Sequence, residues 1–172
     1  MRVLAVDPGL TRCGVAVVET RLDGRTRAVV AEVIRTDPDA DHADRLRRVF
    51  DAVGSYLDDT EPDVLVVERV FSQSNVRSAM GTAQAAAVCM LAANQRGLPV
   101  HQHTPTEVKA AVTGSGRADI IAPVRADKAQ VAFMVGRILG LRDVPKPVDV
   151  TDALALGICH VWRSRTRAGV SA

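Results

Sequence analysis

The apolar pattern of the opening part of the chain predicts strands followed by a helix. Short apolar runs at 3–6, 13–18 and 28–34 are typical of strands, and a Leu-Asp-Gly turn signal at 22–24 separates the last two. From 39 to 59 the apolar residues recur every three or four positions, which indicates an amphipathic helix. We therefore expect three antiparallel strands that lead into one helix.

The middle of the chain predicts two further strands around a long helix. Residues 64–68 form an apolar run that ends in glutamate, which is typical of a strand buried on both faces and parallel to the first strand. The alanine-rich stretch 74–96 predicts a helix closed by Gly97, and 99–103 predicts a fifth short strand. The sheet is therefore expected to be mixed and five-stranded.

Helices fill the last part of the predicted fold. The Thr-Pro-Thr-Glu sequence at 104–107 combines a capping box with proline at the first helical position, and is a strong helix start signal. Helical spacing recurs over 126–139 and 149–162, and we expect residues 164–172 to form a frayed tail. The whole pattern predicts a single α/β domain over 1–172, with helices flanking the sheet.

Composition excludes several classes of protein. With 172 residues, of which 47% are hydrophobic, the chain can bury one core without disulfides or structural metal. The three cysteines are odd in number and far apart, which argues against a disulfide framework or a zinc site. The apolar runs are too short to cross a membrane, and the chain begins with a strand rather than a leader. We therefore expect a cytoplasmic protein with no membrane association.

Charge is unevenly distributed although the formal net charge is only +2. Residues 1–63 are net acidic, whereas 69–148 are net basic. The basic segment is a candidate polyanion-binding region, although a solvated basic face would look the same.

Two of the predicted strands end in a carboxylate, Asp7 and Glu68. Ligands of open α/β sheets gather beyond the carboxyl ends of the strands, so two neighbouring strands would bring these acids together. Like charges at that distance repel unless a cation lies between them, and oxygen ligands suit magnesium or manganese. The ordinary alternative is that Asp7 begins a Pro-Gly turn and Glu68 caps its strand.

A second pair of acids, Asp149 and Asp152, falls on the first turn of the last predicted helix. Residues three apart share one helix face, and the helix dipole favours their ionised form. Aspartate is also a common capping residue, so the pair alone indicates little. Four carboxylates that converge would hold two metal ions and suit phosphodiester hydrolysis.

Over nearly its whole length and in the same order, the sequence resembles the RuvC family of Holliday junction resolvases. The segments that carry the resemblance are VDPGLTRCG at 6–14, VERVF at 67–71, EVK at 107–109, GSG at 114–116, KAQV at 128–131 and DVTDALA at 149–155. The resemblance implies a ribonuclease H-like fold and a homodimer that nicks two symmetry-related strands of a four-way DNA junction. It also implies that Asp7, Glu68, Asp149 and Asp152 bind metal and are catalytic.

Cofactors and partners follow from the same resemblance. We expect two Mg²⁺ ions per active site, with Mn²⁺ able to substitute, and products with a 5′-phosphate and a 3′-hydroxyl. RuvA and RuvB, the branch-migration proteins, are the expected protein partners in recombination and repair.

DNA contacts are expected mainly from the basic middle segment. The resemblance implies that Lys109 and Lys128 handle DNA phosphate and that Phe71 stacks on bases, a contact worth about 1–3 kcal/mol per base. Asn75 and Arg77 are further candidate DNA contacts. Phenylalanine is more often a core residue, but the place of Phe71 directly after a strand-end glutamate favours an exposed position.

One segment departs from the family pattern. Deleting 120–127 would restore the short connection between the Gly-Ser-Gly turn and Lys128, and the Arg-Ala-Asp at 125–127 repeats that at 117–119. We expect a surface-loop insertion at 117–127, which loop-closure entropy tolerates. The fold should accommodate it, whereas the position of Lys128 depends on it.

Three other functions compete with junction resolution. The Asp-x-Gly-x-Thr pattern that begins at Asp7 also resembles the phosphate loop of the actin and sugar-kinase superfamily, but that group needs two such domains. A nuclease that acts on structured RNA would use the same metal chemistry. A non-catalytic junction-binding protein is the third alternative, although clustered acids would hinder phosphate binding.

Overall fold

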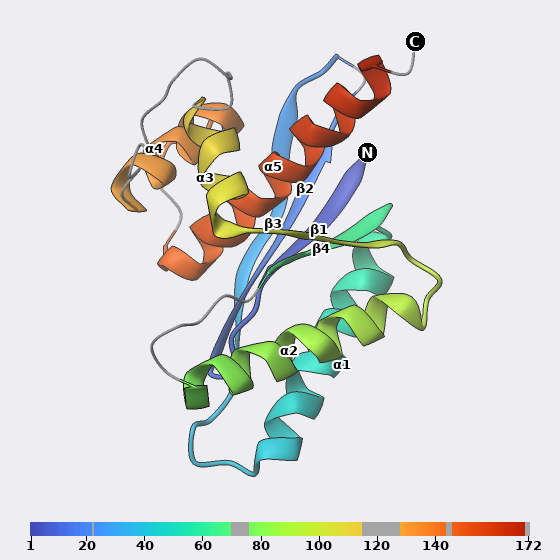
Figure 1. Ribbon diagram of the computed structural model, residues 1–172, viewed down its shortest axis with the longest axis vertical. Coiled ribbons are helices and arrows are strands. Elements are labelled where there is room, and N and C mark those ends of the chain that lie inside the picture. Colours follow the sequence, from blue (N-terminus) through green and yellow to red (C-terminus); the bar gives the residue numbers. More distant parts are fainter. Residues whose placement is uncertain (22, 70–75, 115–127, 144–145, 171–172) are drawn as a thin grey trace.

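One mixed sheet organises the chain, in the strand order β3-β2-β1-β4-β5 (Figure 1). The computed structural model describes residues 1–172 except 22, 70–75, 115–127, 144–145 and 171–172, and describes only the backbone of 77 and 166–170. The strands are β1 (Arg2–Asp7), β2 (Arg12–Thr20), β3 (Thr26–Arg35), β4 (Val64–Glu68) and β5 (Val100–His103). All five were predicted, four of them from apolar runs and β5 from the short segment 99–103.

The strand directions agree with the sequence pattern. β1 pairs antiparallel with β2, and β2 pairs antiparallel with β3, as the hairpin turn signal predicted. β1 pairs in parallel with β4, from Val3 opposite Val64 to Val6 opposite Val67. β4 in turn pairs in parallel with β5. The prediction that these two apolar strands are parallel is therefore confirmed, and the structure shows that they are also neighbours.

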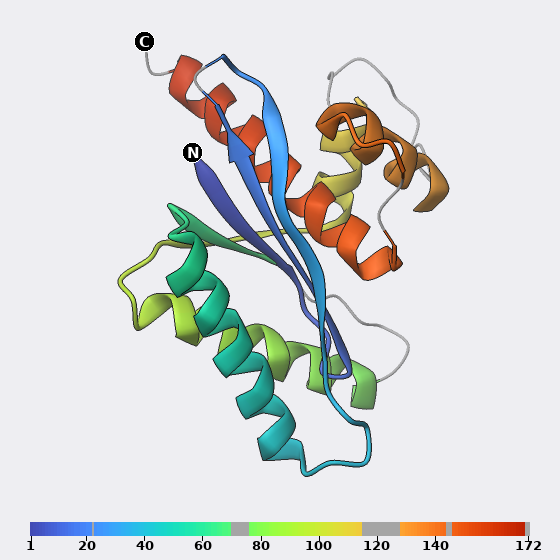
Figure 2. The ribbon, with the colours of Figure 1, turned by 180° about the vertical axis from the view of Figure 1, so that it is seen from behind.

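Helices cover both faces of the sheet (Figures 1 and 2). α1 (His42–Thr60) and α2 (Val76–Asn94) lie on one face. α3 (Pro105–Thr113), α4 (Lys128–Leu139) and α5 (Val148–Val170) lie on the other. No helix of the described part of the chain is long and apolar enough to cross a membrane.

Side chains of β1 alternate between two cores because successive strand residues point to opposite faces. Val3 and Ala5 belong to the core beneath α3, α4 and α5. Leu4 and Val6 belong to the core beneath α1 and α2. This alternation decides which face each strand-end residue takes.

α5 lies close against the sheet because Gly157 removes a side chain where the two meet. A Cβ at Gly157 would lie 2.7 Å from Cγ2 of Val18 and 3.4 Å from Cβ of Ala5. This close approach fixes the height of α5 above β1 and β2, and therefore the position of its first turn.

The largest differences between predicted and observed helix boundaries are at the starts of α1 and α4 and at the end of α5. α1 begins after the N-cap Asp41, whose side chain accepts hydrogen bonds from the backbone N–H groups of Ala43 and Asp44. α4 begins at Lys128 rather than at 126, and the insertion predicted at 117–127 lies outside the described residues.

The third difference concerns the end of the chain. α5 continues past Trp162 and is helical as far as Val170, so the frayed tail expected over 164–172 is not seen up to that residue. Arg165 ties this end of α5 to the β2–β3 turn, because its Nη2 donates a hydrogen bond to the carbonyl oxygen of Gly24 at 3.1 Å. The predicted capping box at Thr104 and Glu107 is present at the start of α3.

Candidate active site

Asp7 and Glu68 end adjacent parallel strands and face the same side of the sheet. Val6 lies opposite Val67 in the ladder, so the next residue of each strand is one of the two acids. Alternation places Asp7 on the same face as Ala5, and Glu68 on the same face as Val66, which is the face that α5 covers. Both acids are half-buried there.

The first turn of α5 brings Asp149 and Asp152 to this end of the sheet. Gly14 lies opposite Asp7 in the β1–β2 ladder. A Cβ at Gly14 would collide with the backbone carbonyl of Asp149 and lie 3.2 Å from its Cβ. The helix therefore starts in direct contact with the strand that neighbours Asp7.

Electrostatic interactions link Asp7 to the other three acids. Burial raises the pKa of Asp7 to about 8, and the charges of Glu68, Asp152 and Asp149 add to that shift. Burial also raises the pKa of Glu68, again with a contribution from Asp152. Carboxylates with raised pKa values at the end of a sheet form a candidate functional site, because a bound cation would relieve the repulsion.

Two lysines compensate part of this negative charge. Nζ of Lys128 lies 3.6 Å from Oδ2 of Asp152. The charge of Lys128 lowers the pKa of Asp7, Glu68 and Asp152, although burial still leaves the pKa of Asp152 raised. Lys109 of α3 acts on Glu68 and Asp152 in the same sense. Both predicted phosphate-handling lysines therefore lie beside the acids and are exposed.

Arg12 is bound to Asp149, the fourth acid, although the sequence motifs did not single out Arg12. Its Nε and Nη2 donate hydrogen bonds to Oδ2 of Asp149, at 2.9 Å and 2.5 Å. The two residues are 137 positions apart in the chain, so no local pattern could pair them. The only sequence signal is that Arg12 lies between the motif residues Asp7 and Gly14.

The donor set fits hard divalent cations. All four candidate ligands are carboxylates, and oxygen ligands with net negative charge are what Mg²⁺ and Mn²⁺ bind. Across the described ranges, no group of three or more histidine, cysteine, aspartate or glutamate side chains is arranged to hold a metal ion as it stands. Asp149 and Asp152 instead face Arg12 and Lys128. A metal would therefore have to share or replace these cations.

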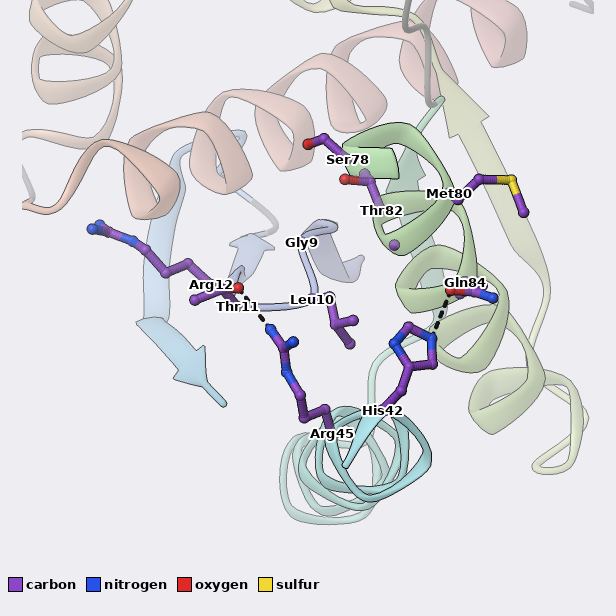
Figure 3. Close-up of a pocket in the computed structure, with 11 residues that line it drawn as sticks. Gly9, Leu10, Thr11, Arg12, His42, Arg45, Ser78, Met80, Thr82 and Gln84 are labelled. Atoms are coloured by element: carbon purple, nitrogen blue, oxygen red, sulfur yellow. Dashed lines mark hydrogen bonds between the residues drawn. The ribbon is translucent and has the colours of Figure 1, made fainter. Parts of the chain in front are cut away.

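An open hollow of about 660 Å³ adjoins the turn between β1 and β2. Figure 3 shows the turn residues Gly9 to Arg12 facing the starts of α1 and α2 across it. Nη2 of Arg45 donates a hydrogen bond to Oγ1 of Thr11 at 2.7 Å. Nε2 of His42 and Oε1 of Gln84 form a hydrogen bond at 2.8 Å. Hydroxyl, amide and cationic groups line the hollow together with the apolar side chains of Leu10 and Met80, and Arg12 links its lining to Asp149.

Of the remaining predicted DNA contacts, Arg77 is the one that falls within the described backbone. The backbone of Arg77 belongs to the first turn of α2, and Ser78 and Thr82 of the same helix line the hollow. Phe71 and Asn75 lie outside the described residues.

Comparison with known proteins identifies the family. The family model described as crossover junction endodeoxyribonuclease RuvC matches residues 3–160. The protein of that name from Frankia alni is 58% identical over 172 residues, which is 100% of this chain and 83% of the relative. The one from Cutibacterium acnes is 54% identical over 162 residues, which is 94% of this chain and 79% of the relative.

A solved structure agrees with the sequence relatives. Thermus thermophilus RuvC in complex with a Holliday junction substrate matches with a TM-score of 0.84 and 30% identity, over 96% of each chain. The five-stranded sheet flanked by helices is therefore the predicted ribonuclease H-like fold. On this evidence, the chain belongs to the RuvC family of crossover junction endodeoxyribonucleases.

Proposed function

We propose that the chain is a metal-dependent, structure-selective DNA endonuclease that resolves four-way junctions by paired symmetric nicks during recombination and repair. Family membership supports the reaction, and a solved family member is bound to a Holliday junction substrate. The observation that carries the proposal is the electrostatic coupling of Asp7 to Glu68, Asp149 and Asp152 where two parallel strands end.

The proposed site holds two Mg²⁺ ions through Asp7, Glu68, Asp149 and Asp152, with Mn²⁺ as a substitute. Such a pair of ions would activate water for in-line attack and stabilise the leaving oxygen, and with the 3′ oxygen as leaving group the products would carry a 5′-phosphate and a 3′-hydroxyl. Asp7 is the central acid of the four, because its charge interacts with the charge of each of the other three. Glu68 is fixed by its strand, whereas Asp149 and Asp152 share the first turn of a helix.

Cationic side chains around the acids are proposed to receive the DNA backbone. Lys109 and Lys128 lie beside the acids, so a phosphate that reached the site would meet both charges. Arg77, Asn75 and Phe71 are proposed as further DNA contacts. Since phosphate contacts position the strand without reading it, these lysines would align the scissile bond rather than select sequence.

A homodimer is proposed because paired nicks need two sites. Three large apolar side chains on α2 are exposed, with 80% of Val76, 56% of Met80 and 50% of Leu91 accessible. Exposed apolar surface of this kind is typical of a face that a partner covers. We further propose that the enzyme works in the cytoplasm with RuvA and RuvB.

Cleavage of an end-labelled four-way junction tests the proposal, beside linear duplex and an RNA–DNA hybrid, with Mg²⁺ and with chelator. We expect paired, symmetric, ligatable nicks confined to the junction and abolished by chelation. Preferential cleavage of RNA would assign the chain to structured-RNA hydrolysis instead. Tight junction binding by wild-type protein without any cleavage would make it a non-catalytic junction-binding protein.

A further inference from the structure

Arg12 is hydrogen-bonded to the carboxylate of Asp149, which the proposed function assigns to a metal ion. Both described hydrogen bonds from its guanidinium fall on the same atom, Oδ2 of Asp149. The pair is accessible, since 43% of the Arg12 side chain and 27% of the Asp149 side chain are exposed. Arg12 is also the first residue of β2, so its backbone is anchored in the sheet while its side chain reaches α5.

Arginine and a divalent cation compete for such a carboxylate. A metal bound at Asp149 would place its charge next to the guanidinium, and the like charges repel. An oxygen that already accepts two hydrogen bonds from arginine also has reduced capacity for inner-sphere coordination. Metal binding through Oδ2 of Asp149 therefore requires that Arg12 move or weaken its hold.

We propose that Arg12 is a positioning residue that holds Asp149 in the metal-free enzyme and leaves it when the metal ion binds. The proposal rests on the proposed function, because it needs Asp149 to be a metal ligand. In the metal-free state the ion pair neutralises one acid of a repelling cluster and keeps the first turn of α5 facing Asp7. In the loaded state the released guanidinium is free to pair with a phosphate of the bound DNA.

Space for this movement lies on both sides of Arg12. The residue lines the hollow between the β1–β2 turn, α1 and α2, and it also lines a second hollow beside Lys146 and Asp149. Figure 3 shows the Arg12 side chain extending away from Thr11 and Arg45, at the rim of the first hollow. A side chain with open space on two sides can leave its partner without moving the backbone.

Neighbouring arginines do not share this arrangement. The guanidinium of Arg45 is fixed by hydrogen bonds to Oγ1 of Thr36, Oγ1 of Thr11 and the carbonyl oxygen of Pro38. Arg35 lies opposite Arg12 in the β2–β3 ladder and is exposed, and it has no described bond to an acid of the cluster. Arg35→Gln therefore removes the same charge at the same level of the sheet and serves as the matched control.

Calorimetric titration of Mn²⁺ into the full-length, DNA-free protein tests the proposal. Arg12→Gln should bind Mn²⁺ about three- to tenfold more tightly than wild type, which corresponds to loss of a partly exposed charged hydrogen-bonded pair. Arg12→Lys keeps the charge but lacks the planar guanidinium group that donates two hydrogen bonds. Its affinity for Mn²⁺ should therefore lie between those of wild type and Arg12→Gln. Arg35→Gln should bind as wild type does.

Two results separate this proposal from the proposed function. Unchanged or weaker Mn²⁺ binding by folded Arg12→Gln and Arg12→Lys, while Asp149→Asn weakens it, would overturn the role of Arg12 and leave the metal site intact. If Asp149→Asn bound Mn²⁺ as wild type does, or wild type bound none, Asp149 would not be a ligand and both proposals would be wrong. Thermal unfolding of each variant without metal verifies that the comparison is made between folded proteins.

Discussion

Gly14 contacts the backbone of Asp149, so that a single missing Cβ lets the last helix start against the strand beside Asp7. The two residues belong to opposite ends of the chain, and their contact is the point at which the helix acids join the strand acids. Because the contact is made by backbone atoms, it does not depend on which metal or which side-chain rotamer is present. The position of the first turn of α5 is therefore determined by packing before any ligand enters the site.

Gly14→Ala should separate the helix acids from the strand acids. The added methyl group would overlap the carbonyl of Asp149, and overpacking of this kind destabilises by about 1–3 kcal/mol. Since a misplacement of about 1 Å can reduce a rate about 100-fold, we expect cleavage of the junction to fall at least tenfold. Urea unfolding and single-turnover cleavage measure the two effects.

Gly136→Ala is the matched control for this substitution. Gly136 is in α4, and nothing lies within 4 Å of a Cβ built there. Alanine should stabilise the helix by up to about 1 kcal/mol and leave cleavage unchanged. Equal losses of activity in the two variants would show that the Gly14 contact is not special.

Asp7 should make the metal-free protein less stable as pH rises. Its pKa is raised from 3.8 to about 8, so between these values the folded state binds a proton that the unfolded state has lost. Stability is then highest below pH 4 with respect to this group and falls as pH increases toward 8. In the presence of chelator, Asp7→Asn should flatten this slope and stabilise the protein at pH 8 by roughly 1–3 kcal/mol. Urea unfolding at several pH values measures it.

One outcome would contradict this prediction for Asp7. A wild-type protein whose stability increases between pH 5 and pH 8 in chelator, with no change in slope on Asp7→Asn, would show that Asp7 ionises freely. Asp39→Asn is a suitable control because Asp39 is exposed, lies in the loop before α1 and is not among the groups that shift the pKa of Asp7.

Metal binding should release a proton from the same group. Asp7 must be ionised to bind a cation, whereas burial and three neighbouring acids keep it protonated at neutral pH. The apparent affinity for Mn²⁺ should therefore increase with pH up to about 8 and level off above it. Calorimetry at pH 7 in buffers of different ionisation enthalpy should report uptake of about one proton by the buffer per site. Equal heats in all buffers would contradict this linkage.

Asp7→Asn should also separate cleavage of the junction from binding to it. Asp7→Asn removes the acid that interacts with all three others, so cleavage should be lost below detection. Junction affinity should persist or increase, since one negative charge near the phosphate is removed. Electrophoretic mobility shifts with four-way junction DNA in chelator measure the binding. Loss of binding together with cleavage would show that Asp7 supports the DNA surface instead.

Periodicity and strand polarity were sufficient to predict half of the site. The apolar runs at β1 and β4 implied buried parallel strands, and the meeting of Asp7 and Glu68 followed on the condition that the two strands are neighbours, as they are. The capping signal at Thr104 predicted α3, which carries Lys109. These features depend on local pattern, and local pattern is what a single sequence contains.

Long-range contacts explain what the sequence could not predict. The bond from Arg12 to Asp149 joins residues 137 positions apart, and either residue alone is an ordinary surface charge. The role of Gly14 depends on a helix that packs from the other end of the chain. Only the arrangement of α5 across β1 and β2 brings these residues together.

Lys128 should affect both the pH dependence of cleavage and the affinity for DNA. Its charge lowers the pKa of Asp7, Glu68 and Asp152, so Lys128→Gln should raise all three and move the acidic limb of the rate profile to higher pH. The salt dependence of junction binding should weaken by about one unit of slope, as for the loss of one phosphate contact. Arg21→Gln, an exposed charge beside the β2–β3 turn, should change neither property. Single-turnover rates between pH 6 and pH 9 and binding at several salt concentrations distinguish the two roles. A reduced salt slope with an unmoved pH profile would make Lys128 a phosphate contact only, with no effect on the acids.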